Sequence, residues 1–140
     1  MANLEQMSAP AILLYAIVAA AVLIYVPFGV VALGRMQAGY DMAAPRALFD
    51  KLPSYAQRAT WAHQNSFESF ATFSVAALMA YVTQQSGDWT ALAAIAYVVA
   101  RLFYSIFYIL NIPIGRSLMF GISTVSTATL FLSSLMSLRP

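Results

Sequence analysis

The chain has 140 residues, of which 61% are hydrophobic and 9% are charged, whereas an average soluble domain carries about 25% charged residues. This composition predicts an integral membrane protein with a single domain over residues 1–140. The net charge of +2 does not favour nucleic acid as a partner, and the absence of cysteine excludes a disulfide framework, a thiolate metal site and a cysteine nucleophile. With one histidine and five carboxylates, we expect no metal site.

Four apolar stretches predict four membrane-spanning helices, at approximately residues 10–33, 62–82, 90–110 and 117–138. Stretches of this length can cross a hydrocarbon core of about 30 Å at about 1.5 Å per residue. The N-terminal segment has no basic region, so the first span is expected to be retained and not cleaved as a signal peptide. The predicted fold is an all-α, integral membrane four-helix bundle.

The end of the first span and the loop after it contain several helix-breaking residues. Pro27 and Gly29 predict a kink or an exit into the lipid headgroups. A polar loop follows over residues 34–53. Within this loop, Pro45 and the apolar residues 47–49 predict a short turn at the membrane interface.

The second helix carries a stripe of polar side chains. The sequence Ser-Tyr-Ala-Gln at residues 54–57 fits a capping box, so the helix is expected to begin there and to run to about Val82. Its first half is polar and its second half apolar, which predicts that it begins outside the membrane and then enters it. Arg58, Asn65 and Glu68 are spaced i, i+7 and i+10 and therefore share one face. Ionisable groups in a membrane are costly and usually functional.

The third and fourth helices follow after short connections. The connection over residues 84–88 predicts that the second and third helices are antiparallel neighbours, with Asp88 as a helix cap. The fourth helix is expected to begin near Arg116, and its small and hydroxyl side chains favour close packing in lipid. The third helix carries a second polar stripe, formed by Arg101, Tyr104, Tyr108 and Asn111.

Basic residues are concentrated in two of the connections. One side of the membrane would carry Arg116 in the third connection, together with four basic residues in the first connection and at the start of the second helix: Arg35, Arg46, Lys51 and Arg58. The opposite side would carry only Arg139. By the positive-inside rule, both termini lie on the non-cytoplasmic side and both polar stripes lie toward the cytoplasmic half.

Together, the two stripes predict a polar pocket between helices for a small zwitterionic or polyanionic ligand. Arg58, Arg101 and Arg116 would bind carboxylate groups. Glu68 would bind an ammonium group, and Asn65 would pair with amides.

Two motifs resemble a known family. The run Ala62-His63-Gln64-Asn65-Ser66-Phe67-Glu68 resembles the Ala-His/Gln-x-Asn-x-x-Glu signature of the membrane-associated proteins in eicosanoid and glutathione metabolism (MAPEG). A second run is similar to that family's third-helix motif and to the arginine that opens its fourth helix, Arg101-x-x-Tyr104-x-x-x-Tyr108-x-x-Asn111-x-Pro113-x-x-Arg116. The resemblance covers the whole chain and is closest to bacterial members that are similar to microsomal glutathione transferases.

The resemblance implies a homotrimer of four-helix subunits, with glutathione as co-substrate bound between neighbouring subunits near the cytoplasmic side. Arg116, helped by Arg101, would be the catalytic residue, because a nearby cation lowers the pKa of a thiol from about 8.5 and so favours the thiolate. By the same resemblance, glutathione would be bound by Asn65, Glu68, Arg101, Tyr104 and Tyr108, with Arg58 as a further ligand.

Two positions depart from the family pattern. Many members carry Arg immediately before the Ala-His/Gln pair, where this chain has Trp61, and Pro three residues after the Glu, where it has Ala71. Arg58, one turn earlier on the same face, is the expected substitute for the missing arginine. The Trp61 departure favours a competing hypothesis, a non-enzymatic trimeric membrane protein that binds a lipid or small anion in the same cleft.

The leading hypothesis is a glutathione transferase or peroxidase of the bacterial inner membrane. Its second substrate would be a lipophilic electrophile or a lipid hydroperoxide that arrives from the bilayer, as in detoxification. A small transporter subunit is disfavoured by the short loops and by the lack of broken spans in corresponding halves.

Several residues also have purely structural interpretations. Glu68 and Arg101 would form an ion pair between helices. Tyr104 and Tyr108 would be packing residues. In addition, Arg58, Arg116 and Trp61 would be anchors at the membrane interface, and His63 would be a packing residue off the polar face.

Overall fold

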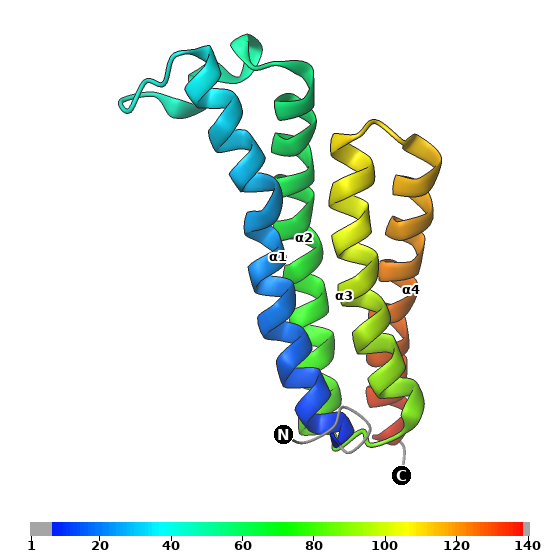
Figure 1. Cartoon of the computed structure of the whole chain (residues 1–140). Coiled ribbons are helices and arrows are strands. Elements are labelled where there is room, and N and C mark those ends of the chain that lie inside the picture. The colour runs from blue at the N-terminus through cyan, green and yellow to red at the C-terminus, as the bar shows by residue number, and fades with distance from the viewer. Residues whose placement is uncertain (1–6, 139–140) are drawn as a thin grey trace.

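The computed structural model describes residues 7–138. In this part of the chain all regular secondary structure is helical, and short turns and loops join the helices. Figure 1 shows the long helices side by side, with the α1–α2 and α3–α4 connections at one end and the α2–α3 connection at the other. The elements in chain order are α1 (Ala9–Ala38), the 3-10 helix η2 (Pro45–Lys51), α2 (Ser54–Val82), α3 (Asp88–Ile109) and α4 (Pro113–Ser137).

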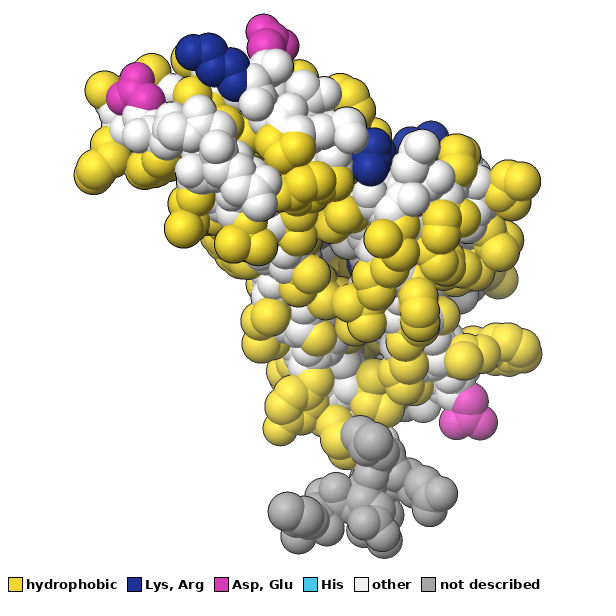
Figure 2. Space-filling view, turned by 45° about the horizontal axis from the view of Figure 1, so that its top comes forward, with side chains coloured by type: hydrophobic (Ala, Val, Ile, Leu, Met, Phe, Trp, Pro, Cys, Tyr) yellow, Lys and Arg dark blue, Asp and Glu magenta, His cyan; other side chains and the backbone are white. Residues whose placement is uncertain are grey.

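Three helices have the length and apolar composition to cross a membrane within residues 7–138, namely α1, α3 and α4. The sequence also predicts a span over residues 62–82, which belongs to α2. Asn65 and Glu68 lower the mean hydropathy of this helix, and its crossing stays a prediction. Figure 2 shows that Lys and Arg lie near the end formed by the α1–α2 and α3–α4 connections, as the counts of basic residues predict.

The interior is built mainly from alanine, which lets the helices approach closely. In the core, the rings of Phe73 on α2 and Tyr97 on α3 are stacked, with centroids 3.6 Å apart. At Gly34 of α1, a Cβ atom would collide with the Cβ of Ala56 on α2. The buried cluster consists of Leu13, Ala16, Ala20, Phe73, Ala76, Ala77, Ala80, Ala93, Ala94, Tyr97 and Leu130.

The fourth helix packs through hydroxyl side chains, as its composition predicts. Ser123, Ser126, Thr127 and Ser134 are buried. Ser126 and Ser134 donate to the carbonyl oxygens of the residues four positions earlier, each at 2.8 Å. These bonds pair the hydroxyl groups within α4 itself, without a partner on another helix. The hydroxyl groups can therefore be buried in a close helix contact without the cost of an unpaired polar group.

The structure corrects one predicted helix start. The first helix continues past Pro27 to Ala38, and the kink or headgroup exit at Pro27 and Gly29 stays a prediction. Helix α4 begins at Pro113 and not near Arg116. Proline suits this position, because the amide groups in the first turn of a helix have no partner within the helix. The predicted short turn is confirmed as η2, which buries Leu48, and its place at the membrane interface stays a prediction.

Both predicted helix caps are also wrong. Pro53 occupies the cap position of α2, and no side chain caps this end. Instead, Gln57 Nε2 donates to the carbonyl oxygen of Phe49 at 3.2 Å and so ties α2 to η2. Gly87 occupies the cap position of α3, and Asp88 is the first helical residue, where its charge still complements the helix dipole.

Candidate functional site

Arg101 joins the polar faces of α2 and α3. Its side chain is 3% exposed, and its Nη2 donates to Asn65 Oδ1 at 3.0 Å and to Ser66 Oγ at 3.4 Å. Its Nη1 is buried and has no hydrogen-bond partner among residues 7–138. Glu68 instead accepts a hydrogen bond from Gln64 at 3.4 Å and lies on the surface. The two stripes therefore meet as predicted, but through an arginine–amide bond and not through a Glu68–Arg101 ion pair.

Two arginines lie over two tyrosines on the α3–α4 side. Arg101 Cζ is 4.1 Å from the ring centroid of Tyr104, and Arg116 Cζ is 4.6 Å from that of Tyr108. The two tyrosine rings meet edge to face at 5.6 Å, as expected for residues one helical turn apart. Cation–π contacts of this kind hold the guanidinium groups without neutralising them. Tyr104, Tyr108 and Arg116, with residues of α4, line a hollow of about 310 Å³.

The turn between α3 and α4 places Arg116 beside this hollow. Asn111 has φ of 58°, in the left-handed region where asparagine is favoured over most residues, and this allows the tight reversal. Arg58 of α2 supports the same turn, because its Nε donates to the carbonyl oxygen of Ile109 at 2.9 Å. That carbonyl belongs to the last residue of α3, so Arg58 satisfies an otherwise unpaired group and complements the helix dipole. Asn111 itself is exposed in the turn and does not continue the α3 stripe.

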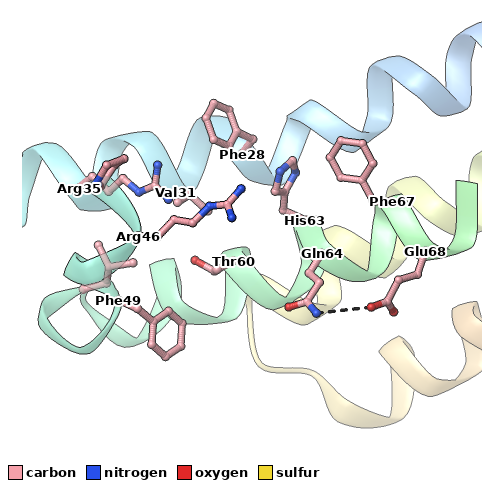
Figure 3. A pocket seen from close by; sticks show the side chains of 12 residues that line it. Phe28, Val31, Arg35, Arg46, Phe49, Thr60, His63, Gln64, Phe67 and Glu68 are labelled. Atoms are coloured by element: carbon pink, nitrogen blue, oxygen red, sulfur yellow. Dashed lines mark hydrogen bonds between the residues drawn. The ribbon is translucent and has the colours of Figure 1, made fainter. Parts of the chain in front are cut away.

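A second, larger cavity lies between α1, η2 and α2, with a volume of about 720 Å³. Figure 3 shows Arg35 and Arg46 at one end of it and Gln64 and Glu68 toward the other. Apolar and aromatic side chains form much of the wall. Glu68 therefore borders this cavity, whereas Arg101, Tyr104, Tyr108 and Arg116 gather on the α3–α4 side.

A comparison with family models identifies the family of the chain. A model of the MAPEG family matches residues 12–136, which include both polar stripes and both arginine–tyrosine pairs. The chain belongs to the MAPEG family. No curated protein and no solved structure gives a significant match to it.

In this MAPEG chain, Trp61 stands where many members carry arginine. Its ring lies between Phe49 of η2, at a centroid distance of 5.7 Å, and Tyr108 of α3, at 6.5 Å. The side chain is 44% exposed. Trp61 thus forms an aromatic bridge between the larger cavity and the α3–α4 hollow. Its ring contacts protein aromatics, and the position at the membrane interface that the sequence suggested stays a prediction.

Among the residues of the larger cavity, the sequence assigned Glu68 to the candidate site but not the arginines and aromatic residues of α1 and η2. Arg35 and Arg46 were counted only for orientation, although Phe28, Val31 and Arg35 share one face of α1 at i, i+3 and i+7. That spacing was the signal in the sequence that could have indicated a shared surface of these residues on α1. His63 was expected to pack, and it does, because its Nδ1 pairs with the carbonyl oxygen of Ile24 at 2.8 Å.

Proposed function

We propose that this membrane protein is a glutathione transferase or peroxidase. Glutathione would enter from the cytoplasmic side, and its thiolate would attack a lipophilic electrophile or reduce a lipid hydroperoxide drawn from the bilayer. Membership of the MAPEG family is consistent with this class of reaction. The choice of glutathione and of these reactions is our inference from the arginines and tyrosines on the α3–α4 side.

The observation that carries the proposal is the position of Arg116. Its guanidinium is held 4.6 Å from the centre of the Tyr108 ring and lines the hollow of about 310 Å³. The Tyr108 ring holds the Arg116 guanidinium in place without neutralising its positive charge, so this charge can act on a ligand. A cation beside a thiol lowers the thiol pKa from about 8.5 and so raises the thiolate fraction at neutral pH. We therefore assign thiolate stabilisation to Arg116.

The other predicted glutathione ligands take different roles in the proposal. Glu68 has an exposed carboxylate that would bind the ammonium group. Asn65 would pair with a peptide amide, and the hydroxyl groups of Tyr104 and Tyr108 would line the thiol end. Arg58 would bind a carboxylate with the guanidinium nitrogens that its bond to α3 leaves free.

Arg101 would act through its neighbours. Because its side chain is 3% exposed and donates to Asn65, it would position that amide and the Tyr104 ring without touching glutathione.

We further propose that α2 is a fourth span inside a homotrimer. Glu68 lies about 21 Å along α2 from Ser54, at about 1.5 Å per residue, and its side chain is exposed in a single chain. A carboxylate exposed to hydrocarbon at that depth is costly. Neighbouring copies would cover this face of α2 and place glutathione between subunits, near the cytoplasmic side of a bacterial inner membrane.

A second candidate function is a non-enzymatic trimer that binds a lipid or small anion in the same cleft. The bridging position of Trp61 favours it, because the aromatic ring supplies no charge for a glutathione carboxylate. Conjugation of glutathione to a generic aryl halide separates the two functions, since only an enzyme accelerates it.

The test of the proposed function is ultraviolet difference absorbance of the detergent-purified protein during titration with glutathione. A saturable thiolate band at neutral pH, lost in Arg116→Gln, is the expected result. Absence of the band in the unaltered protein, together with no thermal shift in glutathione, would exclude the proposal and leave the binding function.

A further inference from the structure

We propose that Arg58 is a positioning residue, whose hydrogen bond to the end of α3 holds Arg116 in place beside the thiol of the co-substrate. This role rests on the proposed function, in which Arg116 stabilises the thiolate. It adds to that function a side chain of another helix that decides where Arg116 lies.

The carbonyl group that Arg58 binds lacks its usual backbone partner. In a continuous helix, the carbonyl oxygen of Ile109 would accept from the amide group four positions later. That position is Pro113, which has no amide hydrogen. Instead, Arg58 Nε donates to this oxygen at 2.9 Å, from a helix 51 positions earlier in the chain. A partly buried carbonyl group without a donor is costly, so this bond stabilises the end of α3.

The turn that follows this carbonyl group is held by its own backbone. The amide of Asn111 donates to the carbonyl oxygen of Tyr108 at 3.2 Å, and the amide of Ile112 donates to that of Phe107 at 2.8 Å. With Asn111 in the left-handed region, these two bonds form a Schellman motif. Only three residues join α3 to α4, and they have little conformational freedom. The start of α4 must therefore follow the end of α3.

The start of α4 also packs closely on α3. A Cβ atom added at Gly115 would lie 2.7 Å from the ring of Phe107, so the two helices are in tight contact at this point. Arg116 is the next residue, and its guanidinium lies over the ring of Tyr108, which also belongs to α3. The end of α3, the turn and Arg116 therefore move as one body. A bond that fixes this body relative to α2 also fixes Arg116.

Arg58 joins this body to the helix that would hold the co-substrate. Asn65, a proposed ligand of glutathione, lies on the same face of α2 as Arg58. Arg101 also links α2 to α3, through Asn65, but it lies eight residues before Ile109, about 12 Å along α3. The bond of Arg58 lies at the turn itself, where a small tilt of α3 displaces Arg116 most.

Two substitutions of Arg58 separate its hydrogen bond from its charge. The amide nitrogen of glutamine follows Cβ, Cγ and Cδ, as Nε does in arginine, so Arg58→Gln keeps a donor at this point and removes the charge. Methionine has a similar shape and no donor, so Arg58→Met removes both. For each variant, the pKa of the thiol of bound glutathione is measured from the thiolate absorbance as a function of pH, at saturating glutathione.

The two variants should differ in this thiol pKa. We expect Arg58→Met to raise it by about one unit, which lowers the thiolate fraction roughly tenfold at a pH below the pKa. Arg58→Gln should leave the thiol pKa unchanged. It should weaken glutathione binding, because its charge is proposed to bind a carboxylate, but this loss does not enter a pKa measured at saturation. The control is Lys51→Gln, which removes a cation of η2 and should change neither quantity.

The fluorescence of Trp61 reports on the same bond without any ligand. Its ring lies 6.5 Å from that of Tyr108, and in a Trp89→Phe background it is the one tryptophan of the chain. Movement of the end of α3 away from α2 would expose this ring. We therefore expect acrylamide to quench Trp61 more strongly in Arg58→Met than in Arg58→Gln.

Three results would overturn the proposal. An unchanged thiol pKa in Arg58→Met would show that the bond does not position Arg116, and stronger quenching of Trp61 in the same variant would then make the bond purely structural. An equal rise of the thiol pKa in both variants would assign the effect to the charge of Arg58. If Arg58→Met does not fold, a raised thiol pKa in Arg58→Gln overturns the proposal by itself.

Failure of the proposed function has a different signature. In that case the unaltered protein shows no thiolate band with glutathione, and the role assigned to Arg58 falls with it. A band in the unaltered protein that does not respond to Arg58→Met overturns the role of Arg58 alone and leaves the proposed function in place.

Discussion

At the scale of single residues, the arginines differ in what they are free to do. Arg101 is buried and bonded to Asn65, and Arg58 is bonded to the end of α3. Arg116 has a ring beneath it and an open hollow beside it. In the proposed function, chemistry on the thiol therefore falls to Arg116, Arg101 holds α2 and α3 together, and Arg58 both supports the end of α3 and would bind a carboxylate.

Substitution of Arg116 should separate turnover from binding. We expect Arg116→Gln to lower kcat by roughly 100-fold while the Kd for glutathione changes little, because a cation that acts on the developing thiolate contributes mainly to the transition state. Steady-state kinetics with an aryl halide and glutathione titrations measure the two effects. An equal loss of kcat and affinity would make Arg116 a binding residue only.

Substitution of Glu68 should weaken glutathione binding, in contrast to substitution of Arg116. Since Glu68 is exposed and makes only a 3.4 Å bond to Gln64, Glu68→Gln should leave the thermal unfolding temperature unchanged. The Kd for glutathione should rise by about tenfold, the effect of losing roughly one charge-assisted hydrogen bond. A fall in unfolding temperature with intact binding would show that the carboxylate is structural.

The bond between Arg101 and Asn65 should be measurable as a coupling energy. In a double-mutant cycle with Arg101→Met and Asn65→Ala, we expect a coupling of about 1.5–3 kcal/mol, because the bond involves a charged donor in a buried place. Denaturant unfolding in detergent provides the free energies. A coupling near zero would mean that Arg101 contributes by packing on Tyr104 alone.

At the scale of helices, small residues set the distances between elements. Alanines line the contact of α1 with α2 and α3, and Gly34 brings α1 against Ala56 near the η2 end. That contact fixes the width of the α1–α2 end where Arg35 enters the larger cavity. A larger side chain at this point must push the two helices apart, because its collision is with a Cβ atom close to the backbone.

Gly34→Ala should therefore destabilise the protein although alanine favours helices. We expect a loss of about 1–3 kcal/mol from overpacking. Gly29→Ala on the same helix is the matched control, since nothing lies within 4 Å of its added Cβ, and it should stabilise by up to about 1 kcal/mol. Thermal unfolding of both variants in one detergent makes the comparison. Equal stability of the two would show that α1 and α2 separate at no cost.

At the scale of the whole molecule, the polar face of α2 is exposed in a single chain. The proposed homotrimer would place that face against other copies. Because the chain has no cysteine, a single introduced cysteine reports on this contact without interference. We expect Glu68→Cys to form disulfide-linked copies on mild oxidation in native membranes, and the trimer mass to appear in detergent.

The control for this experiment is Val22→Cys on α1, where the valine is 61% exposed. A lipid-facing cysteine at this position should remain a monomer. Cross-linking at Val22 with none at position 68 would place another face in the contact and contradict the arrangement proposed for α2.

The sequence by itself determined the helical class, the apolar spans of α1, α3 and α4, and the family. These properties depend on composition and on spacing along one helix, both of which are local. It also identified the two polar stripes, apart from Asn111 in the turn after α3, because residues at i, i+3, i+4 and i+7 of a helix must share a face.

Only the tertiary structure decided which groups of the two stripes meet. Arg101 pairs with Asn65 and not with Glu68, Arg58 caps α3, and Trp61 bridges two hollows. It also brought Arg35 and Arg46 together from separate elements. Each of these contacts depends on the rotation and depth at which two helices pack. Small residues such as Gly34 help to set that packing, and the spacing of residues along one helix does not predict which residues of another helix they will meet.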